Sequence, residues 1–564
     1  MSGKINLWDA VPGNDWFDDK DLENHPTWLL DLTHSIPRLT PMEGWFWSKY
    51  MNYGGTRAME ELSMPAVKGL LRRIKNGCDY LCFIPVTEEA ELMQRASVHR
   101  EQVLKYSSNF PQWWDESKQK MLQWYQELLE FDLEAATHTE LLGHLYDLME
   151  TSRKMWEIHF IGLRTVSEAW VLLEDLFMEL WGLNDNSPEF QKLMSGFDNK
   201  IMQTDKRLWG LARSAVDRGI SDIIMYTDPG ELFPVLEKKP EGGKWLQDFK
   251  LFLQEDGWRI PHGHTFSEPP WIEDPDQAIR RLMGYIEKNE AVFSPDHKRE
   301  KMAKERESVF SMLLPKVPEE RKNDFLKLIP AAQLAGAFNE EHNYYCENYC
   351  HGVIRRGLLG IGRRLKETGV IDQETDIFFL NPPEVERVLP GPDGCNLTFI
   401  VQRRRREWEQ WSQETPPPII TKRASADEAF KLDISQWKDP IIKVVFGEMS
   451  EVREELKADL CGLPVSGGVV EGLARVVTAP EQLDAIKQGE ILVAPFTASS
   501  WTPVFALLKG VVTDVGGALS HTAIVSREYG IPAVASVGEG TKKIRTGQRI
   551  RLNGDEGAVY ILDK

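Results

Sequence analysis

The sequence predicts a multidomain protein in which a large, mostly α-helical domain is followed by a compact α/β domain. Its 564 residues are several times the length of a typical single domain. Apolar residues recur at spacings of three and four over residues 119–183 and 276–368, which is typical of amphipathic helices. Short β-branched segments separated by glycine and proline begin only in the last hundred residues. We therefore expect a helical domain over 1–402, a linker or hinge region over 403–460, and the α/β domain over 461–564.

The first 400 residues are rich in tryptophan. They hold 15 of the 19 tryptophans, so the two ends of the chain differ in character. Residues 1–120 mix aromatic and polar side chains and are interrupted by Pro37 and Pro41, and the long helices that follow end at Gly182. The tryptophans suit a flat aromatic ligand and an ordinary core equally well, and composition does not separate the two.

Proline and arginine mark four later segments. Residues 227–275 contain seven prolines, which predicts a loop-rich excursion. Asp376–Leu380 is apolar and precedes two prolines, which predicts a short extended segment. The run Arg403–Arg406 is followed by glutamates and indicates the solvated face of a helix. Pro416–Pro418 predicts a semi-rigid part of the hinge.

The charge balance limits the class of partner. There are 67 basic and 87 acidic side chains, which gives a net charge of −20. Nucleic acid and anionic membrane surfaces are therefore not expected as partners. No run of 18 apolar residues is present, and the first 25 residues lack the apolar core of a secretory signal. We expect a cytoplasmic protein.

Six cysteines are too few for a disulfide framework in a chain of this length, which agrees with a reducing compartment. Two pairs, Cys78 with Cys82 and Cys346 with Cys350, share a C-x3-C spacing and together can supply four metal ligands. Each pair lies in apolar surroundings that read as helical. We favour buried, inert thiols over a zinc or cluster site.

Within the α/β domain we expect one helix over about 520–529 and the strands Leu473–Val477, Ile491–Ala494 and Gly510–Asp514. Gly516 and Gly517 permit a tight turn after the last of these strands. Ser520 is a suitable N-cap, so His521 falls in the first turn of the helix. A helix N-terminus attracts phosphate and favours a neutral imidazole, which is the form that accepts a phosphoryl group. A structural histidine is the alternative, and Arg527 is a further candidate to face the anion.

The order and spacing of motifs in this domain closely resemble the swivelling phosphohistidine domain of phosphoenolpyruvate-utilising enzymes. The resemblance covers about residues 460–564 and is highly specific. It rests on the segments Leu463–Val476, Leu492–Thr497, Thr513–Glu528 and Gly530–Val534, and on the closing Gly547, Asn553-Gly554, Gly557 and Val559. The resemblance implies that His521 is the phosphorylated residue. Which ring nitrogen reacts stays open.

Nucleotide-binding motifs are missing from the sequence. There is no G-x4-G-K-[ST] loop and no glycine-rich series of the ATP-grasp kind before residue 440. Such domains accompany the phosphohistidine domain in phosphoenolpyruvate synthase and pyruvate phosphate dikinase. We therefore expect ATP and Mg²⁺ to bind a partner ATP-grasp subunit rather than this chain.

The middle of the chain is similar to rifampin phosphotransferase over Gly357–Ile371 and Asp376–Leu380, and His34–Pro41 resembles the start of its acceptor domain. This match is looser than the C-terminal one. An acceptor domain joined to a phosphohistidine domain, with ATP-grasp on another chain, resembles the large subunit of phenylphosphate synthase. The resemblance implies transfer of a phosphoryl group from ATP to a phenol, with AMP and phosphate as the other products.

Candidate acceptor-site residues lie close together in sequence. His351 and Arg355 are four apart and share a helix face. We expect Arg355 to stabilise the transferring phosphoryl group and His351 to take the phenolic proton. His342 and Arg356 are further substrate-binding candidates. The pair His262 and His264 lacks a supporting carboxylate or cysteine pattern, and we expect no metal site.

Two other functions stay open from the sequence. The acceptor can be another alcohol, as in antibiotic phosphotransfer. The chain can also be a phosphocarrier or regulatory protein that passes the group to a protein, although 400 tryptophan-rich residues exceed what such a carrier needs.

Overall fold

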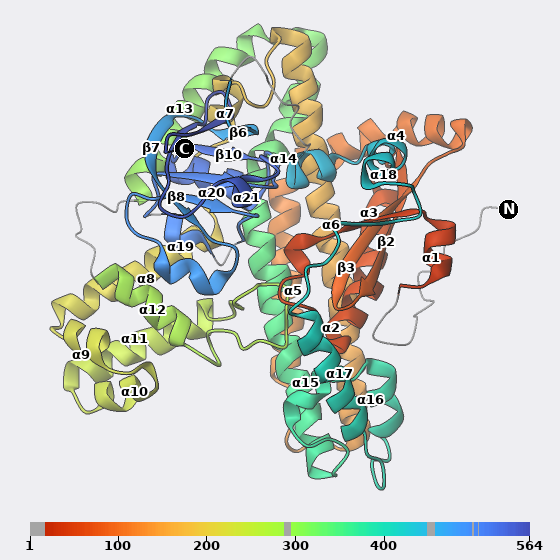
Figure 1. Ribbon diagram of the computed structural model, residues 1–564, viewed down its shortest axis with the longest axis vertical. Helices are drawn as coiled ribbons and strands as arrows, with labels where there is room; N and C mark the ends of the chain where they lie inside the picture. The colour runs from red at the N-terminus through yellow and green to blue at the C-terminus, as the bar shows by residue number, and fades with distance from the viewer. Residues whose placement is uncertain (1–16, 287–294, 448–456, 499–500, 506, 564) are drawn as a thin grey trace.

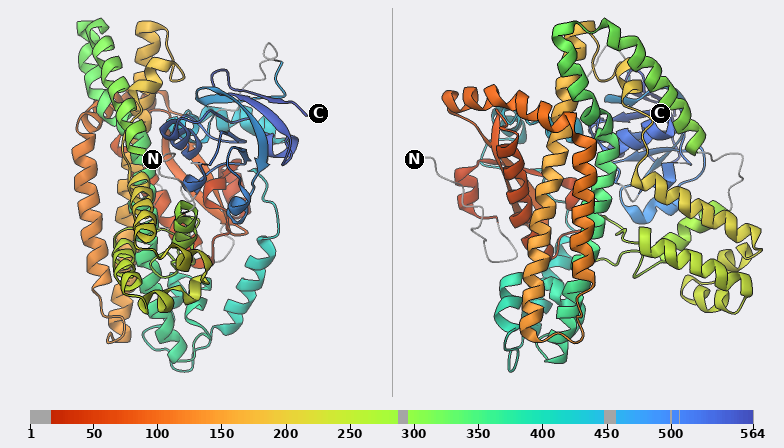
Figure 2. Two further views of the ribbon diagram at one scale, coloured as in Figure 1. Left: turned by 90° about the vertical axis from the view of Figure 1, so that its left-hand side faces the viewer. Right: turned by 180° about the vertical axis from the view of Figure 1, so that it is seen from behind.

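The predicted fold class is confirmed: a large helical region is followed by a compact α/β domain that packs against one side of it (Figures 1 and 2). The computed structural model describes residues 17–286, 295–447, 457–498, 501–505 and 507–563. No helix of the described residues is long and apolar enough to cross a membrane.

Long helices form the frame of the helical region. The longest, α6, has 44 residues; it begins at a Thr137 capping box and ends at Gly182, which adopts φ +66°. Seen from behind, α6 runs over most of the height of the molecule, and the shorter α5 lies beside its lower part (Figure 2). The frame consists of α4 (Glu89–Ser108), α5 (Phe110–Leu129), α6 (His138–Trp181), α13 (Pro295–Leu313), α14 (Glu319–His342) and α15 (Cys350–Glu367).

A four-stranded sheet near the N-terminus was not predicted. Its order is β2-β3-β1-β4, and all its pairs are antiparallel. Asn76 and Gly77 both have positive φ and form the two-residue turn between β2 and β3. The elements of this part are α1 (Asp19–Asn24), β1 (Thr27–Leu30), η1 (Leu32–His34), α2 (Pro41–Phe46), η2 (Trp47–Met51), α3 (Asn52–Glu61), β2 (Val67–Lys75), β3 (Cys78–Pro85) and β4 (Ile419–Thr421).

The prediction that residues 227–275 form a loop-rich excursion is wrong for most of the segment. Pro229 and Pro240 each open a helix, where a missing N–H costs nothing. The two helices belong to a small helical lobe with its own core around Trp245 (Figure 1). The lobe contains α8 (Lys200–Asp217), α9 (Ser221–Tyr226), α10 (Pro229–Glu237), α11 (Pro240–Asp256) and α12 (Asp276–Ile286); α7 (Pro188–Leu193) precedes it.

Two shorter predictions need correction. Residues 374–379 form the 3₁₀ helix η6 rather than an extended segment, because Gln373 and Asp376 build a capping box. The arginine run lies on α17 (Thr398–Trp411), but its face is only partly solvated. Arg404 is buried and donates to Phe379 O at 2.8 Å and to Glu384. α16 (Pro382–Val388) lies between these two elements.

Much of the predicted linker packs on the helical region. β4 pairs with β1, and Tyr80 donates to the carbonyl of Pro417 at 2.9 Å. Prolines accept hydrogen bonds without donating any, so the triplet fits at this edge of the sheet. Two further elements, α18 (Ala426–Leu432) and the π-helix η8 (Ile442–Phe446), continue to residue 447. The boundary at 402 and the hinge stay predictions.

The α/β domain holds one eight-stranded sheet of order β5-β12-β11-β7-β8-β9-β10-β6. The neighbours from β7 to β10 are parallel, and the flanking pairs are antiparallel. The predicted strand 491–494 and helix at 520 are confirmed, while β7 begins earlier than predicted. The elements are β5 (Leu460–Cys461), β6 (Leu463–Ser466), β7 (Val469–Val476), η10 (Pro480–Ala485), β8 (Ile491–Ala494), α19 (Thr502–Phe505), β9 (Gly510–Thr513), α20 (His521–Tyr529), β10 (Ala533–Ala535), α21 (Gly540–Lys543), β11 (Arg549–Asn553) and β12 (Ala558–Ile561).

Candidate active site

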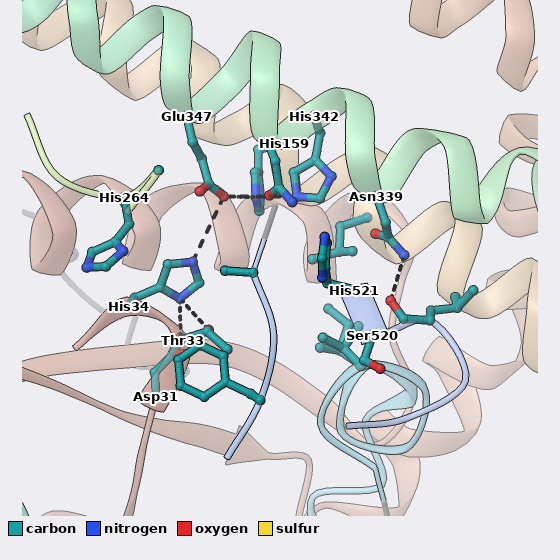
Figure 3. Close-up of a pocket in the computed structure, with 18 of the residues that line it drawn as sticks. Asp31, Thr33, His34, His159, His264, Asn339, His342, Glu347, Ser520 and His521 are labelled. Atoms are coloured by element: carbon teal, nitrogen blue, oxygen red, sulfur yellow. Dashed lines mark hydrogen bonds and ion pairs between the residues drawn. The ribbon is translucent and has the colours of Figure 1, made fainter. Parts of the chain in front are cut away.

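A cavity of about 190 Å³ lies between the α/β domain and the helical region (Figure 3). The α/β domain contributes the start of α20, the turn before it and residues 496–498. The helical region contributes β2, β3, α6, α14, η5 (Asn343–Tyr349) and the loop at 262–264. The apolar lining residues include Met51, Leu70, Leu81, Phe83, Phe160, Leu163, Ile441, Val445, Phe496 and Leu519.

No tryptophan of the residues that the structure describes lines this cavity. Trp28, Trp47, Trp156 and Trp170 are instead fully buried in the large core. The abundance of tryptophan in the first 400 residues therefore reflects the core of the helical region more than a ligand site.

His521 occupies the position that the sequence predicts. The Ser520 side chain accepts from the backbone N–H of Ala523, so Ser520 is the N-cap and His521 is the first residue of α20. Gly516 adopts φ +137°, a conformation that L side chains rarely adopt. A Cβ on Gly517 would clash with the carbonyl oxygens of Lys443 and Val444, which explains why this position lacks a side chain.

Two threonine hydroxyls hold the His521 ring. Thr497 Oγ1 lies 2.7 Å from Nδ1, and Thr502 Oγ1 lies 3.0 Å from Nε2. The ring packs edge-on against Phe505, and the side chain is 7% exposed. Burial lowers the pKa of His521 to about 3, so the imidazole is neutral. The neutral form was predicted from the helix dipole, but removal from water is the larger cause.

Backbone hydrogen bonds fix the α/β domain on the helical region. The N–H groups of Gly517 and Leu519 donate to the carbonyls of Val445 and Val444, at 2.9 and 2.6 Å. Asn339 on α14 donates its amide to Leu519 O at 3.3 Å. The turn that presents His521 is thus held from both sides in this docked arrangement.

Glu340 is a carboxyl group of the helical region that comes near His521. Its Oε2 lies 3.9 Å from His521 Nε2 and has no hydrogen-bond partner among the described residues. Burial raises the pKa of Glu340 to about 8, although Arg259 acts in the opposite sense. The carboxyl group is therefore mostly protonated near neutral pH, and it can donate a hydrogen bond toward the ring.

A histidine-rich cluster lines the helical side of the cavity, and sequence reasoning missed most of it. Glu347 Oε1 lies 3.4 Å from His159 Nε2, 4.0 Å from His342 Nε2 and 3.9 Å from His34 Nε2 (Figure 3). His34 Nδ1 is 2.7 Å from Asp31 Oδ2. These residues come from η1, α6, the end of α14 and η5, so no local motif marks them.

The charge states in this cluster follow from burial and pairing. Burial alone would raise the pKa of Glu347, but contacts with His159 and His34 hold it well below its ordinary value. Burial lowers the pKa of His342 to about 3 and also lowers that of His159. Burial would lower the pKa of His34 as well, but Asp31 and Glu347 raise it to about 10. The cluster therefore combines an anionic carboxylate with two neutral imidazoles and one charged imidazole.

Of the four acceptor residues predicted from the sequence, the structure brings His342 into the cavity with His521 and leaves the other three outside its lining. His351 is buried against Trp47, and its Nδ1 is 3.3 Å from Gly263 O. Arg355 pairs with Glu273 at 2.8 Å and donates to Ser267 O at 2.6 Å. Arg356 donates to Leu129 O at 2.5 Å on the far face of α15. The positions of these three do not support a role at the acceptor.

Arg527 does not line the cavity either. It donates to the carbonyls of Val465 and Ala518 and stacks over Trp170. These partners hold α20 in its own domain and against α6. The predicted contact between Arg527 and an anion at His521 is therefore not supported.

The four cysteines of the two C-x3-C motifs are buried, as predicted. Contrary to the prediction, Cys78 and Cys82 do not lie on a helix. Cys78 and Cys82 lie on strand β3, while Cys346 and Cys350 lie in η5 and at the start of α15. Burial raises the pKa of Cys350 to about 12. Among the described residues, no cysteine belongs to a group of side chains that could hold a metal ion.

Comparisons with known proteins agree with this arrangement. Residues 486–557, which include His521, match the PEP-utilising enzyme mobile domain. Residues 159–340 match the rifampicin phosphotransferase fourth domain. The chain thus contains one region similar to the mobile domain of PEP-utilising enzymes and a helical region similar to the fourth domain of rifampicin phosphotransferase.

Three relatives show how much of the chain is shared. Over 554 residues the chain is 27% identical to chondramide synthase of Chondromyces crocatus. The aligned region covers 95% of this chain and 14% of that protein. It is 26% identical to the uncharacterized phosphotransferase YvkC of Bacillus subtilis, with coverage of 70% and 45%. It is 31% identical to rifampicin phosphotransferase of Bacillus subtilis, with coverage of 61% and 37%. The chain spans less than half the length of each relative.

Proposed function

We propose that this chain is a phosphotransferase in which His521 receives a phosphoryl group at a nucleotide site and delivers it to a small hydroxyl compound in the cavity. The observation that carries the proposal is the position of His521. A neutral imidazole at the start of α20 faces a cavity whose opposite wall belongs to another domain. The match of this domain to a mobile domain supports a carrier role.

Hydrogen bonding favours Nε2 of His521 as the phosphorylated nitrogen. If Nδ1 carries the proton and donates to Thr497, the lone pair lies on Nε2, on the side of Thr502 and Glu340. In the delivery step the Nε2–P bond breaks and a bond from phosphorus to the acceptor oxygen forms. Phosphoryl transfer of this kind depends mainly on positioning and on charge stabilisation.

The hydroxyl proton needs an acceptor, and His264 is our candidate. Its Nδ1 is 2.9 Å from His262 O, while Nε2 is buried without a hydrogen-bond partner among the described residues. Burial lowers the pKa of His264 to about 4, so the ring is neutral. It lines the same cavity and lies beside His34 (Figure 3).

The cavity size favours a single-ring acceptor such as a phenol. An engineered cavity of about 150 Å³ holds benzene, whereas pockets for drug-sized ligands are about 300–1,000 Å³. The cavity of about 190 Å³ combines many apolar lining side chains with polar groups on both sides, which suits an aromatic alcohol. The named relative rifampicin phosphotransferase supports a second candidate, an antibiotic-type alcohol. A protein acceptor is less favoured because His521 is buried when it is docked.

We further propose that ATP and Mg²⁺ bind a partner ATP-grasp subunit, with AMP and phosphate as products beside the phosphorylated acceptor. The lack of a G-x4-G-K-[ST] loop in the sequence supports this division.

The direct experiment combines the chain with an ATP-grasp partner, ATP, Mg²⁺ and a panel of phenols and larger alcohols. We expect an aryl phosphate and AMP in equal amounts, with the smallest phenols used best. Product formation by the His521→Ala protein at the wild-type rate would contradict the proposal.

A further inference from the structure

The cluster His159, His342 and Glu347 on the helical side of the cavity has no assigned role. Its three potential ligand atoms lie within 4.8 Å of one another, and all three residues are buried. His159 comes from α6, His342 ends α14 and Glu347 lies in η5 (Figure 3). Three segments that differ in sequence position therefore converge on one point of the cavity wall.

The π-helix η5 is what aligns His342 with Glu347. Residues five apart lie about 140° from each other around an α-helix, so their side chains diverge. A π-helix closes its hydrogen bonds from i to i+5 and brings such residues onto one face, and π-turns often occur at functional sites. Five positions separate His342 from Glu347, and η5 covers Asn343–Tyr349 between and after them.

We propose that His159, His342 and Glu347 bind one divalent transition-metal ion of the Zn²⁺ class. Ligand bonds of about 2.0–2.2 Å place the ligand atoms of a tetrahedral ion about 3.3–3.6 Å apart. The separation of 3.4 Å from Glu347 Oε1 to His159 Nε2 matches this range, and the 4.0 Å from Glu347 Oε1 to His342 Nε2 would shorten by a few tenths of an ångström when the ion binds. Two histidines and one glutamate with an open position form a known type of catalytic zinc site.

The ligand chemistry distinguishes between ions. Two imidazole nitrogens suit Zn²⁺, Co²⁺ or Fe²⁺, whereas Mg²⁺ and Ca²⁺ prefer oxygen ligands only. His342 Nδ1 is 2.9 Å from Phe338 O, which fixes the tautomer and leaves Nε2 with its lone pair toward the cluster. Asp31 contacts His34 Nδ1, and His34 Nε2 in turn lies 3.9 Å from Glu347 Oε1. Groups that contact a ligand in this way form the outer shell of metal sites.

All three ligands line the cavity that His521 enters. An ion bound there would keep its open coordination positions toward the cavity. If the proposed function holds, the oxygen of the acceptor hydroxyl occupies one of them, and the ion lowers the pKa of the hydroxyl before transfer. This role rests on the proposed function, whereas ion binding does not.

Ion binding is measured on the full chain without substrate. The protein is dialysed against a chelator and then titrated separately with Zn²⁺, Co²⁺ and Mg²⁺, using calorimetry and visible absorption. We expect one tight equivalent of Zn²⁺ or Co²⁺, a Co²⁺ d–d absorption of a four- or five-coordinate site, and no tight Mg²⁺ binding.

Two ligand variants and one matched control complete the experiment. His159→Gln and Glu347→Gln should each weaken Zn²⁺ binding by more than about 100-fold, because even outer-shell changes cost about 10–100-fold. His144→Gln changes another buried histidine of α6, and it should leave stoichiometry and affinity unchanged. Circular dichroism confirms that each variant is folded.

Two results would overturn the metal site: no tight equivalent in the wild-type protein, or equal affinity in the wild-type and both folded ligand variants. Ion binding without phosphoryl transfer to any hydroxyl would instead contradict only the proposed function.

Discussion

The side chain of His521 is neutral because of where the docked domain places it. Burial lowers its pKa to about 3, and two threonines fix the ring. A ring in this state is a nucleophile and a leaving group without any change in protonation at neutral pH. The chemistry at this residue is therefore set by its surroundings more than by its intrinsic basicity.

We expect the His521→Ala variant to fold and to carry no acid-labile, base-stable phosphate after incubation with partner and ATP. The side chain that would hold the phosphoryl group is removed, while the N-cap at Ser520 stays. Phosphate labelling with acid and base treatment measures this. His144→Gln, outside the cavity, should label as the wild type does. Undiminished labelling of the His521→Ala protein would remove His521 from its assigned role.

Thr497→Val should slow phosphoryl transfer by about 2- to 10-fold. The change removes the hydroxyl 2.7 Å from His521 Nδ1, and a hydrogen bond of this kind contributes about 0.5–1.5 kcal/mol. A single-turnover assay from the phosphorylated protein measures the rate. Thr513→Val is the matched control, because Thr513 is buried in the same domain and its hydroxyl has no partner among the described residues. Equal rates in both variants would show that Thr497 does not orient the ring.

Sequence reasoning located His521 because the signals are local. Glycines, an N-cap and a histidine within six positions define a turn and a helix start. His159 and Glu347 are 188 positions apart and meet only through tertiary packing and a π-helix, so no local pattern could identify them. Arg355 carries the expected charge, but its guanidinium is occupied by Glu273 and backbone carbonyls. Helix spacing alone cannot show that the residues of α15 lie outside the lining of the cavity.

At the scale of elements, the turn before α20 binds the segment that leads into its own domain. Its backbone N–H groups donate to the last turn of η8, which belongs to the segment leading into the α/β domain. Backbone contact this close requires that position 517 lack a side chain.

Gly517→Ala should therefore weaken docking. The new Cβ would clash with Lys443 O and Val444 O, so the turn must move away from η8. We expect phosphorylation of His521 by the partner to continue, while transfer to the acceptor slows by at least tenfold. Separate assays of the two half-reactions measure this. Gly210→Ala is the control, because a Cβ there meets nothing within 4 Å. Normal transfer in the Gly517→Ala protein would mean that the docked arrangement is not the delivering one.

Long periodic helices and the β-branched strands of the α/β domain were predictable, since their hydrophobic periods are strong. The N-terminal sheet was missed although Asn76-Gly77 between two apolar runs is a hairpin signal. The loop prediction for residues 227–275 was wrong because the sequence does not distinguish a proline at the first position of a helix from a proline in a loop.

At the scale of the whole molecule, several buried histidines tie stability to pH. Burial is the main cause that lowers the pKa values of His144 and His351 to about 4. On unfolding, these rings regain an ordinary pKa near 6.5 and take up protons below it. The free energy of unfolding should therefore fall as pH decreases from about 6.5 toward 4.

Urea unfolding at pH 7 and pH 5 tests this. We expect a loss of stability that is smaller in the His144→Gln protein by about 1–2 kcal/mol, because glutamine takes up no proton. The exposed Leu251→Gln substitution provides a control for a change that does not titrate. An identical loss in wild type and His144→Gln would assign the acid sensitivity to other groups.

If His521 carries a phosphoryl group from ATP as proposed, its burial in the docked state also bears on how much ATP is lost to hydrolysis. A phosphoimidazole that meets bulk water is slowly hydrolysed, and closed sites prevent this by excluding water. The His521 side chain is 7% exposed when docked, so on this proposal hydrolysis would occur mainly while the domain is undocked. The number of ATP molecules consumed per product should therefore rise when docking is weakened, even where the chemistry of transfer is intact. The ratio of ATP consumed to product formed would then depend on the domain interface rather than on the catalytic groups.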